Sequence, residues 1–389
     1  MLNNLFENIS NVFKKNLKGN LELHEPAFNH DELNILKRCV KKRDVSTAGS
    51  FTRSLEKVLA KKLKCKKVIT TNSGTSALQL ALISLDVKKN DEVLMPSLNY
   101  IASANACLYI GSKPHFVDVN INTLGVDVIK LEKYLKSITK VKNGVCTNKI
   151  TKRKIKAIIC LHTFGHPCEV DKIKKIANKF NLCLIEDAAE GLGSYYKRKH
   201  VGTFGDIGIL SFNGNKIITT GGGGAVITNN KSLADKIFNL STIFKKRHKW
   251  KYEYDNLGYN YRMPSLNAAI GLAQMKKLNM FLSKKRNLYK KYEKRFNNNK
   301  YFSLFKEPKN CKSNYWLQTI LLNKKSVKLR DKIINKLFKN KIRVRPLWRP
   351  IHKSKYLSKM PRMRLESTLD LENRIINLPS SPNVLNKIK

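Results

Sequence analysis

Residues 208–224 read GILSFNGNKIITTGGGG and place one lysine, Lys216, in a polar turn that leads into four consecutive glycines. Two short apolar segments, 207–212 and 225–228, flank this turn and have the composition of β-strands. They predict a hairpin at the end of a sheet, with the lysine held at the mouth of that sheet. Partial desolvation at such a position would make the amine of Lys216 nucleophilic.

An acidic motif lies upstream of this turn and also follows an apolar segment. Residues 186–190 read EDAAE and come directly after the apolar run 182–185. Because α/β proteins place functional groups at the carboxyl ends of parallel strands, Asp187 is a candidate partner for a protonated ring nitrogen. A helix N-cap is an equally good interpretation of the same residue.

A third motif, TTNSGTSAL at residues 70–78, lies between a predicted strand and a predicted helix. Gly74 allows a tight turn, and Thr75 and Ser76 bring N–H groups and hydroxyls to the start of the helix. Such a helix start binds anions and suits a phosphate. The motif also suits an ordinary Ser/Thr helix cap, so both interpretations stay open.

The order of the elements predicts an α/β fold. From residue 22 to about 255, short apolar segments alternate with helical ones, which is typical of a mostly parallel sheet between helices. The predicted strands are 67–70, 92–95, 115–118, 155–161 and 182–185, and the predicted helices are 75–85, 101–110 and 170–180. Beyond residue 256, helices at 265–297 and 327–340 and strands at 315–322 and 342–345 predict a smaller α+β domain. We therefore divide the chain into a basic helical extension (1–20), a large domain (21–255) and a small C-terminal domain (256–389).

The 389-residue chain carries a net charge of +48, from 76 basic and 28 acidic residues. The lysines are spread along the chain without a nucleic-acid-binding motif. We therefore interpret them as solvated side chains, or as a field that steers an anionic substrate, and expect no nucleic-acid partner. No apolar run approaches the ~18–20 residues that span a bilayer, and the first residues lack the pattern of a secretory signal. These features predict a cytoplasmic protein.

The eight cysteines form no C-x-x-C pair and have no regular spacing, which predicts reduced, mostly buried thiols. His162 and His166 lie four residues apart, a spacing that suits a metal on a helix, but Phe164, Gly165 and Pro167 predict a loop here. The sequence therefore predicts no metal site. Two phosphate-binding motifs, G-x-x-x-x-G-K-[ST] and G-x-G-x-x-G, are absent.

Taken together and in this order, the three motifs resemble those of the DegT/DnrJ/StrS family of sugar aminotransferases, which are pyridoxal-phosphate enzymes of fold type I. Other segments extend the resemblance: LHEPAF (23–28), VSTAGSF (45–51), LGYNYRMPSLNAAIG (257–271), RPLW (345–348) and RIINLPSS (374–381). It covers the chain from about residue 21 to its end. The family's fold implies a large cofactor-binding domain with a mixed, mostly parallel sheet between helices, and a smaller C-terminal α+β domain.

The resemblance is greatest to the subgroup that acts on UDP-linked 4-keto-6-deoxy-N-acetylglucosamine, in the legionaminic acid and bacillosamine pathways. It implies transamination with pyridoxal 5′-phosphate, which passes through pyridoxamine 5′-phosphate, and L-glutamate as the amino donor. The implied product is UDP-4-amino-4,6-dideoxy-N-acetylglucosamine. The alternatives are the same chemistry on a GDP-, dTDP- or non-acetylated UDP-linked keto-sugar, of perosamine or viosamine type, or a relative that does not transaminate.

The resemblance also implies roles for individual residues. Lys216 would be the catalytic Schiff-base lysine, and Asp187 would pair with the ring nitrogen of the cofactor. Tyr100 would stack on the cofactor ring, and Glu190, where many relatives have Gln, would contact its 3′-oxygen. Further contacts are implied for the cofactor from Gly74, Thr75, Ser211 and Asn260, and for the sugar nucleotide from Arg262 and His352. Because Asn260 would reach the cofactor of a neighbouring subunit, the resemblance implies a homodimer with shared active sites.

Overall fold

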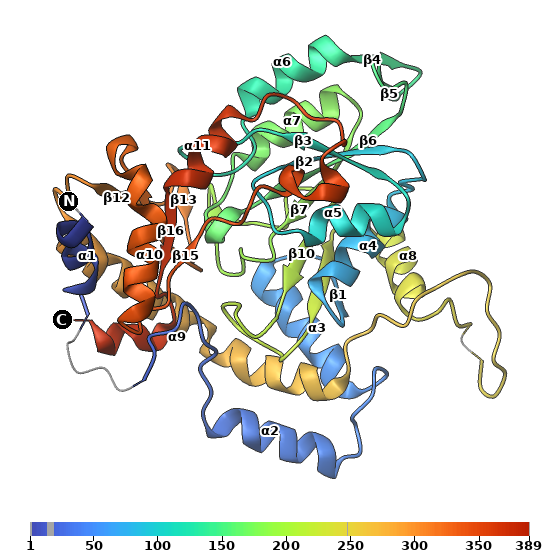
Figure 1. The fold of residues 1–389 in the computed structure, drawn as a ribbon. Coiled ribbons are helices and arrows are strands. Elements are labelled where there is room, and N and C mark those ends of the chain that lie inside the picture. The colour runs from blue at the N-terminus through green and yellow to red at the C-terminus, as the bar shows by residue number, and fades with distance from the viewer. Residues whose placement is uncertain (1, 14–18, 247, 389) are drawn as a thin grey trace.

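The computed structural model describes residues 2–13, 19–246 and 248–388, and its largest feature is a seven-stranded sheet (Figure 1). The strands lie in the order β1, β11, β10, β7, β6, β2, β3. Of these seven, β11 alone runs against the others. Their bounds are β1 (Lys67–Thr71), β2 (Glu92–Pro96), β3 (Lys113–Val117), β6 (Ile155–Leu161), β7 (Cys183–Asp187), β10 (Ile207–Ser211) and β11 (Gly224–Thr228). The predicted mostly parallel α/β sheet is confirmed.

Helices cover both faces of this sheet and make it the middle of three layers (Figure 1). Alternate side chains of a strand point to opposite faces, so Ile209 of β10 enters one hydrophobic cluster and Leu210 enters another. The first cluster holds residues of α4 (Gly74–Ser84), α5 (Ala102–Tyr109) and α8 (Lys231–Ser241). The second holds residues of α2 (His30–Lys41), α3 (Ser50–Leu63), α6 (Val128–Ile138), α7 (Val170–Lys179) and α9 (Ser265–Phe296). Because both faces are covered, the strands are buried at almost every position.

The hairpin predicted around Lys216 is confirmed, but its predicted place at the end of the sheet is wrong. β10 and β11 pair antiparallel, with Ser211 opposite Gly224. On its other side β11 pairs with β1, which occupies the edge and places Thr70 opposite Ala225. The local sequence could not show this pairing, because it joins segments that are far apart in the chain. Its effect is to bring the motif at residues 70–78 beside the glycine-rich turn.

A second, antiparallel sheet has four strands in the order β12 (Phe302–Leu304), β14 (Gln318–Leu322), β16 (Ile375–Leu378) and β15 (Arg345–Pro346). The 32-residue helix α9 joins the two sheets, because its later residues Leu288, Tyr292 and Phe296 enter the core of the second one. Helices α10 (Arg330–Lys339) and α11 (Glu366–Arg374) complete this part. The strand predicted at 342–345 is wrong except for its last residue, because β15 begins at Arg345 and Ile342 forms an isolated bridge with Leu21.

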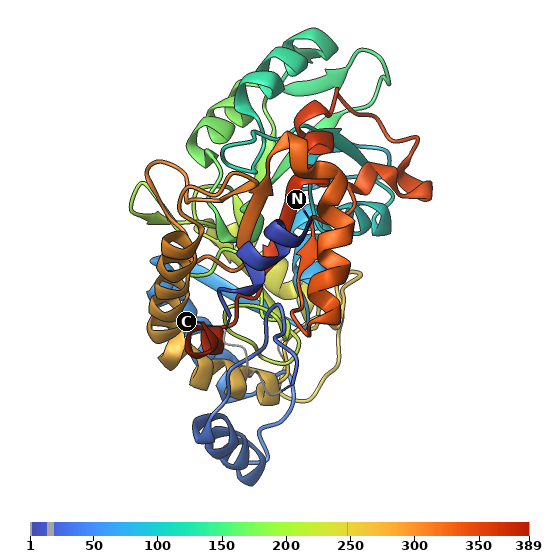
Figure 2. The ribbon, with the colours of Figure 1, turned by 60° about the vertical axis from the view of Figure 1, so that its left-hand side comes forward.

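The N-terminal helix α1 (Leu2–Ser10) lies against α10 (Figure 2). Its residues Leu5 and Ile9 are fully buried in the same cluster as Ile320 and Leu337. This helix has the amphipathic pattern predicted for the extension, whereas residues 14–18 of that extension lie outside the described residues. The domain boundaries at residues 20 and 255 stay predictions.

Short ribbons complete the described part: β4 (Thr139–Lys142) pairs with β5 (Val145–Asn148), and β8 (Tyr195–Tyr196) lies between β9 (Lys199–His200) and β13 (Cys311–Lys312). Over residues 2–13, 19–246 and 248–388, no helix has both the length and the apolar character needed to cross a membrane. The cytoplasmic location stays a prediction.

Candidate active site

A cavity of about 340 Å³ lies at the carboxyl ends of the parallel strands of the large sheet. The predicted residues Gly74, Thr75, Tyr100, Asp187, Glu190, Ser211 and Lys216 all line it. Its other lining residues are Asn72, Ser73, Leu78, Asn99, Ala102, Leu161, Ala189, Asn213, Asn215, Gly222, Gly223, Trp316 and Trp348. A larger hollow of about 700 Å³ lies elsewhere, beside α9 and β13, and none of the predicted site residues lines it. The smaller cavity is therefore the candidate active site, because seven of the predicted site residues line it.

Lys216 projects from the turn after β10 toward an acid and an aromatic ring. Its Nζ lies 3.6 Å from Oε1 of Glu190 and 4.0 Å from the centroid of the Trp316 ring. The indole N–H of Trp316 donates to the carbonyl of Asn215 at 2.7 Å, which fixes the ring beside the turn. Trp316 comes from the segment before β14, so the second sheet contributes to the site.

Asp187 is the last residue of β7, and no helix begins in the segment that follows, so its interpretation as a helix N-cap is wrong. Its carboxylate accepts from the hydroxyl of Ser103 at 2.9 Å and from the N–H of Ala189 at 3.2 Å. Burial raises the pKa of Asp187 above its ordinary value, although these two donors and Lys216 act in the opposite direction. A buried carboxylate of this kind calls for a cationic partner in the cavity.

The start of α4 forms the opposite wall of the cavity. Ser73 is its N-cap and accepts from the N–H of Ser76 at 3.0 Å, so the predicted helix cap is confirmed. The first N–H groups of a helix have no intrahelical partner, and Gly74 and Thr75, the first two residues of α4, line the cavity. A Cβ on Gly74 would lie 3.2 Å from Cβ of Ser211, so the hydroxyl of Ser211 closes the same corner. This corner presents donors and a positive helix end, as an anion site requires.

The model of the DegT/DnrJ/EryC1/StrS aminotransferase family matches residues 26–387. The chain belongs to this family. It is 38% identical over 368 residues to the GDP-perosamine synthase of Escherichia coli O157:H7, covering 94% of this chain and 95% of that relative. It is 35% identical over 341 residues to the UDP-4-amino-4,6-dideoxy-N-acetyl-beta-L-altrosamine transaminase of Campylobacter jejuni subsp. jejuni serotype O:23/36 (strain 81-176), covering 87% of this chain and 86% of that one.

A solved structure supports the fold. Helicobacter pylori PseC, an aminotransferase involved in the biosynthesis of pseudoaminic acid, superposes with a TM-score of 0.85 and 26% identity, over 94% of this chain and 95% of that one. The DegT-family chain is therefore a pyridoxal-phosphate-dependent sugar aminotransferase.

The cavity of this aminotransferase fits pyridoxal phosphate. Asn99 lines it, and both polar atoms of its side chain are buried without a hydrogen-bond partner in the described structure, as expected of a group that a ligand completes. Sequence reasoning missed Asn99 because it looks like an ordinary loop residue after β2. It also missed Trp316 and Trp348, which line the cavity but lie beyond residue 256 in the sequence. The aromatic ring of Trp348 lies 6.3 Å from that of Tyr100, which is half exposed at the rim.

Three predicted residues do not line the cavity. Arg262 is buried in an ion pair with Glu56 at 2.7 Å and donates to the carbonyl of Thr70 at 3.0 Å. Nδ1 of His352 shares a hydrogen bond of 2.6 Å with the hydroxyl of Ser97. Asn260 is exposed and bridges to Thr242. In this protomer Arg262 therefore has a structural partner already, and the substrate roles of Arg262 and His352 stay predictions.

Glu190 is expected to make the stability of the cofactor-free enzyme depend on pH. Burial raises its pKa from 4.5 to about 7, against the opposing effects of Lys216 and of the Phe164 N–H, which donates to it at 2.7 Å. Between these two pH values the folded state binds more protons than the unfolded state, so stability falls as pH rises through this window. Glu190→Gln should remove a penalty on the order of 3 kcal/mol at pH 8 and flatten the profile, measured by chemical unfolding from pH 5 to 8.

The exposed Glu132 provides the control. Its carboxylate pairs with Lys179, which lowers its pKa, so it titrates below this window. Glu132→Gln should keep the wild-type slope between pH 5 and 8. An unchanged slope in Glu190→Gln would show that the Glu190 carboxyl is not the group responsible.

Gly224 is expected to tolerate no side chain, because it packs behind the start of α4. A Cβ there would lie 2.6 Å from the N atom of Gly74 and 2.6 Å from the backbone of Ser73. Gly224→Ala should therefore cost about 1–3 kcal/mol of stability and weaken binding of pyridoxal phosphate, measured by thermal unfolding and by titration of the cofactor. Gly214→Ala is the matched control, since a Cβ at Gly214 meets no atom within 4 Å. Equal effects of the two variants would contradict the packing argument.

Proposed function

We propose that this aminotransferase transfers nitrogen from L-glutamate to C4 of a GDP-linked 4-keto-6-deoxy sugar, as a perosamine-type enzyme would. The GDP-perosamine synthase of E. coli O157:H7, at 38% identity over 94% of the chain, is the observation that carries this proposal. Further support comes from the GDP-perosamine synthase of Vibrio cholerae, at 32% identity over the same share of the chain. The motifs resemble most those of the subgroup that acts on a UDP-linked N-acetylated sugar, with the GDP-linked sugar as an alternative. The relatives favour that alternative.

The roles proposed for the cavity residues follow from their geometry. Bound pyridoxal phosphate would supply an electron sink for the carbon that loses or gains a proton. Asp187, buried at the end of β7, would hold the ring nitrogen in its protonated form. Gly74, Thr75 and Ser211 would bind the phosphate at the start of α4. The unpartnered amide of Asn99 would complete the set of polar contacts.

Lys216 would transfer the protons that transamination removes from the amino donor and adds to the sugar. In its free-amine form, a lysine that is held in the cavity removes a proton from the donor's carbon and later delivers one to the sugar's C4. Glu190, 3.6 Å from Nζ, is placed to share a proton with the lysine, and its pKa of about 7 allows both protonation states near neutral pH. Trp316 covers the other side of the amine and limits the access of water.

The UDP-linked N-acetylated sugar is the second candidate substrate. It is favoured by the C. jejuni altrosamine transaminase relative, whose name includes a UDP-linked N-acetylated sugar. The two candidate substrates differ in the nucleotide base and in the C2 substituent of the sugar. We therefore distinguish the two candidates by measurement.

Amination of the GDP-linked sugar is the expected result of a substrate panel. The purified enzyme with pyridoxal phosphate and glutamate would be incubated with GDP-4-keto-6-deoxymannose, the UDP-linked 4-keto-6-deoxy-N-acetylglucosamine and a dTDP-linked 4-keto-6-deoxyhexose. Mass spectrometry should show ketone-to-amine conversion of the GDP sugar, with a kcat/KM at least ~10-fold above the others, which corresponds to about 1.4 kcal/mol of discrimination. Preferential amination of the UDP sugar would reverse the assignment, and loss of water from the sugar in place of amine gain would show a non-transaminating relative.

We further propose that the active unit is a homodimer whose subunits share the sites. Asn260 is exposed and does not line the cavity of its own protomer. It ends a segment, 248–260, that runs out from the body of the molecule and exposes Trp250, Tyr252 and Leu257 (Figure 1). Exposed apolar side chains of this kind mark an interaction surface. Analytical ultracentrifugation should show a dimer. Asn260→Ala should weaken cofactor binding and leave the dimer intact.

A further inference from the structure

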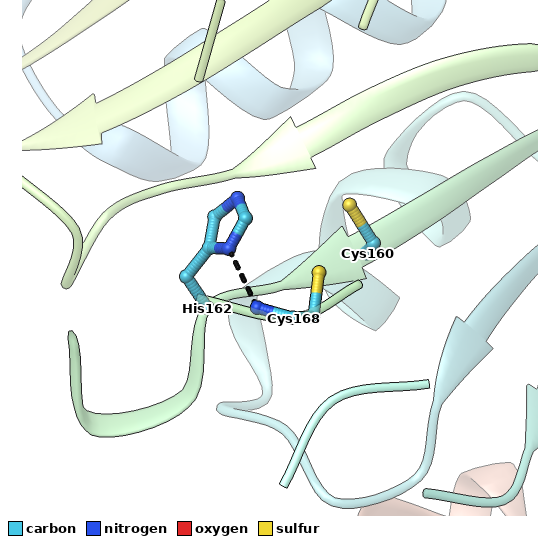
Figure 3. Close-up of side chains that lie close together, drawn as sticks. All are labelled: Cys160, His162 and Cys168. Carbon is cyan, nitrogen blue, oxygen red and sulfur yellow. Dashed lines mark hydrogen bonds between the residues drawn. The ribbon is translucent and has the colours of Figure 1, made fainter. Parts of the chain in front are cut away.

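A buried group of metal-ligating side chains lies behind the active site. Cys160 is on β6, and His162 and Cys168 stand at the two ends of the loop that follows (Figure 3). One ligand atom from each residue lies within 4.8 Å of the other two. All three side chains are fully buried. None of them lines the cavity, so the proposed reaction leaves them without a role.

The donor set is that of a thiophilic cation. Two cysteines and one histidine are ligands that Zn²⁺ and Cu⁺ prefer over Mg²⁺ or Ca²⁺. In a tetrahedral zinc site the ligand atoms lie about 3.5–3.8 Å apart, given the usual metal–ligand bond lengths. The three ligand atoms lie within 4.8 Å of one another, so movements of no more than about 1 Å would bring them to these separations. Two thiolates balance the charge of Zn²⁺, as a buried cation requires.

A carboxylate already orients the histidine as metal sites require. Nε2 of His162 lies 3.1 Å from Oε2 of Glu186. Glu186 in turn accepts from the N–H groups of Gly202 and Gly205, both at 2.7 Å. This carboxylate–histidine arrangement fixes the ring and leaves Nδ1, which faces the N–H of Cys168 at 3.2 Å, on the side of the cysteines.

We propose that Cys160, His162 and Cys168 bind one thiophilic cation of the Zn²⁺ class. Each thiol gives up its proton to solvent on binding, and the cation takes the place of the hydrogen bond between Nδ1 of His162 and the N–H of Cys168. The cation ties β6 to the far end of the loop 163–167. That loop contains Phe164, whose N–H donates to Glu190 in the active site. The site is therefore a clamp for the loop that holds Glu190.

The sequence spacing alone did not indicate this site. It suggested only the pair His162 and His166. In the structure His166 is not part of the cluster: its ring packs on those of Phe305 and Tyr315, with centroid distances of 4.9 and 5.4 Å. The loop after β6 turns back instead, through Phe164 at a φ of 56°, and returns Cys168 to His162.

The test is the metal content of the purified holoenzyme. The enzyme, prepared without chelator and with a thiol-free phosphine reductant, should retain about one zinc per chain by elemental analysis. Cys168→Ala should retain at least ~10-fold less, whereas Cys107→Ala, which removes a buried cysteine from α5, should retain the wild-type amount. Stripped wild-type enzyme should also show a rise in Tm that grows with added Zn²⁺ and is absent with Mg²⁺.

A spectroscopic measurement on the wild type avoids any dependence on folded variants. Loading the stripped enzyme with Co²⁺ should produce thiolate-to-cobalt charge-transfer absorption in the near ultraviolet. Retention of copper in place of zinc would support the site and identify its cation. Equal zinc in the wild type and in Cys168→Ala, no thiolate absorption with Co²⁺, or a Cys160–Cys168 disulfide in enzyme isolated without reductant would each overturn the proposal. These readouts are independent of the substrate, so the proposed function can fail without affecting them.

Discussion

Replacing Lys216 with alanine is expected to lower the kcat/KM of transamination by at least ~10⁴-fold, the upper range for loss of a general acid–base. The amine that would move the proton disappears, and the remaining groups in the cavity cannot replace it. Glu190 is 3.6 Å from this amine, but its carboxylate accepts a hydrogen bond from the Phe164 N–H. We therefore do not expect it to take over the proton transfer. The measurement is the initial rate at which the keto-sugar is aminated, with the cofactor content determined on the same sample.

A surface lysine provides the control for this variant. Lys199 also stands over an aromatic ring, 4.7 Å from the centroid of Phe204, but is exposed and does not line the cavity. Lys199→Ala should keep wild-type kcat/KM. If Lys216→Ala bound cofactor normally and retained more than about one hundredth of the activity, a different base would have to be sought.

Asp187→Asn is expected to lower kcat by roughly 10²–10³-fold, the typical cost of removing one preorganised electrostatic contact. The amide keeps the size of the side chain but carries no charge, so it cannot hold a protonated ring nitrogen. Affinity for pyridoxal phosphate should fall as well. The absorption spectrum of the bound cofactor should shift with pH in the variant, because no negative charge then stabilises the protonated ring nitrogen.

Ser103→Ala separates this effect from loss of a hydrogen bond. It removes one donor to Asp187 and leaves the carboxylate charge in place. The expected loss is about 1 kcal/mol, or roughly fivefold in rate. If Asp187→Asn were no worse than Ser103→Ala, the charge of Asp187 would have no catalytic importance.

Local sequence was sufficient for most of the elements of the large sheet and for several of the residues that line its cavity. Short apolar segments bounded by turn residues predicted the strands of the large sheet within a few positions, since burial on both faces requires continuous apolar runs. A Ser/Thr helix cap was a credible interpretation of residues 70–78, because a hydroxyl ahead of a helix satisfies its orphan N–H groups, and the structure assigns that cap to Ser73. Lys216 and Asp187 stood out because polar groups directly after apolar strands are unusual unless a site needs them.

Pairings and contacts between distant segments were not accessible in the same way. The edge position of β1, the arrival of Trp316 beside Lys216 and the unpartnered amide of Asn99 each depend on segments far apart in the chain. No local pattern specifies such contacts. Burial likewise decided the acid–base character of Glu190, because a carboxyl's pKa depends on its surroundings and not on its neighbours in sequence.

The sequence by itself predicted the α/β class, because hydrophobic periodicity and turn chemistry act over a few residues. The family and the motif residues that gather at the cavity were implied by the resemblance of the motifs to those of the DegT/DnrJ/StrS family. The tertiary structure alone decided which of those residues meet. It placed the start of α4 against Gly224, kept Arg262 in an ion pair with Glu56, and returned Cys168 to Cys160 and His162. The physical reason is that sheet order and loop closure are fixed by packing of the whole core, which no single segment encodes.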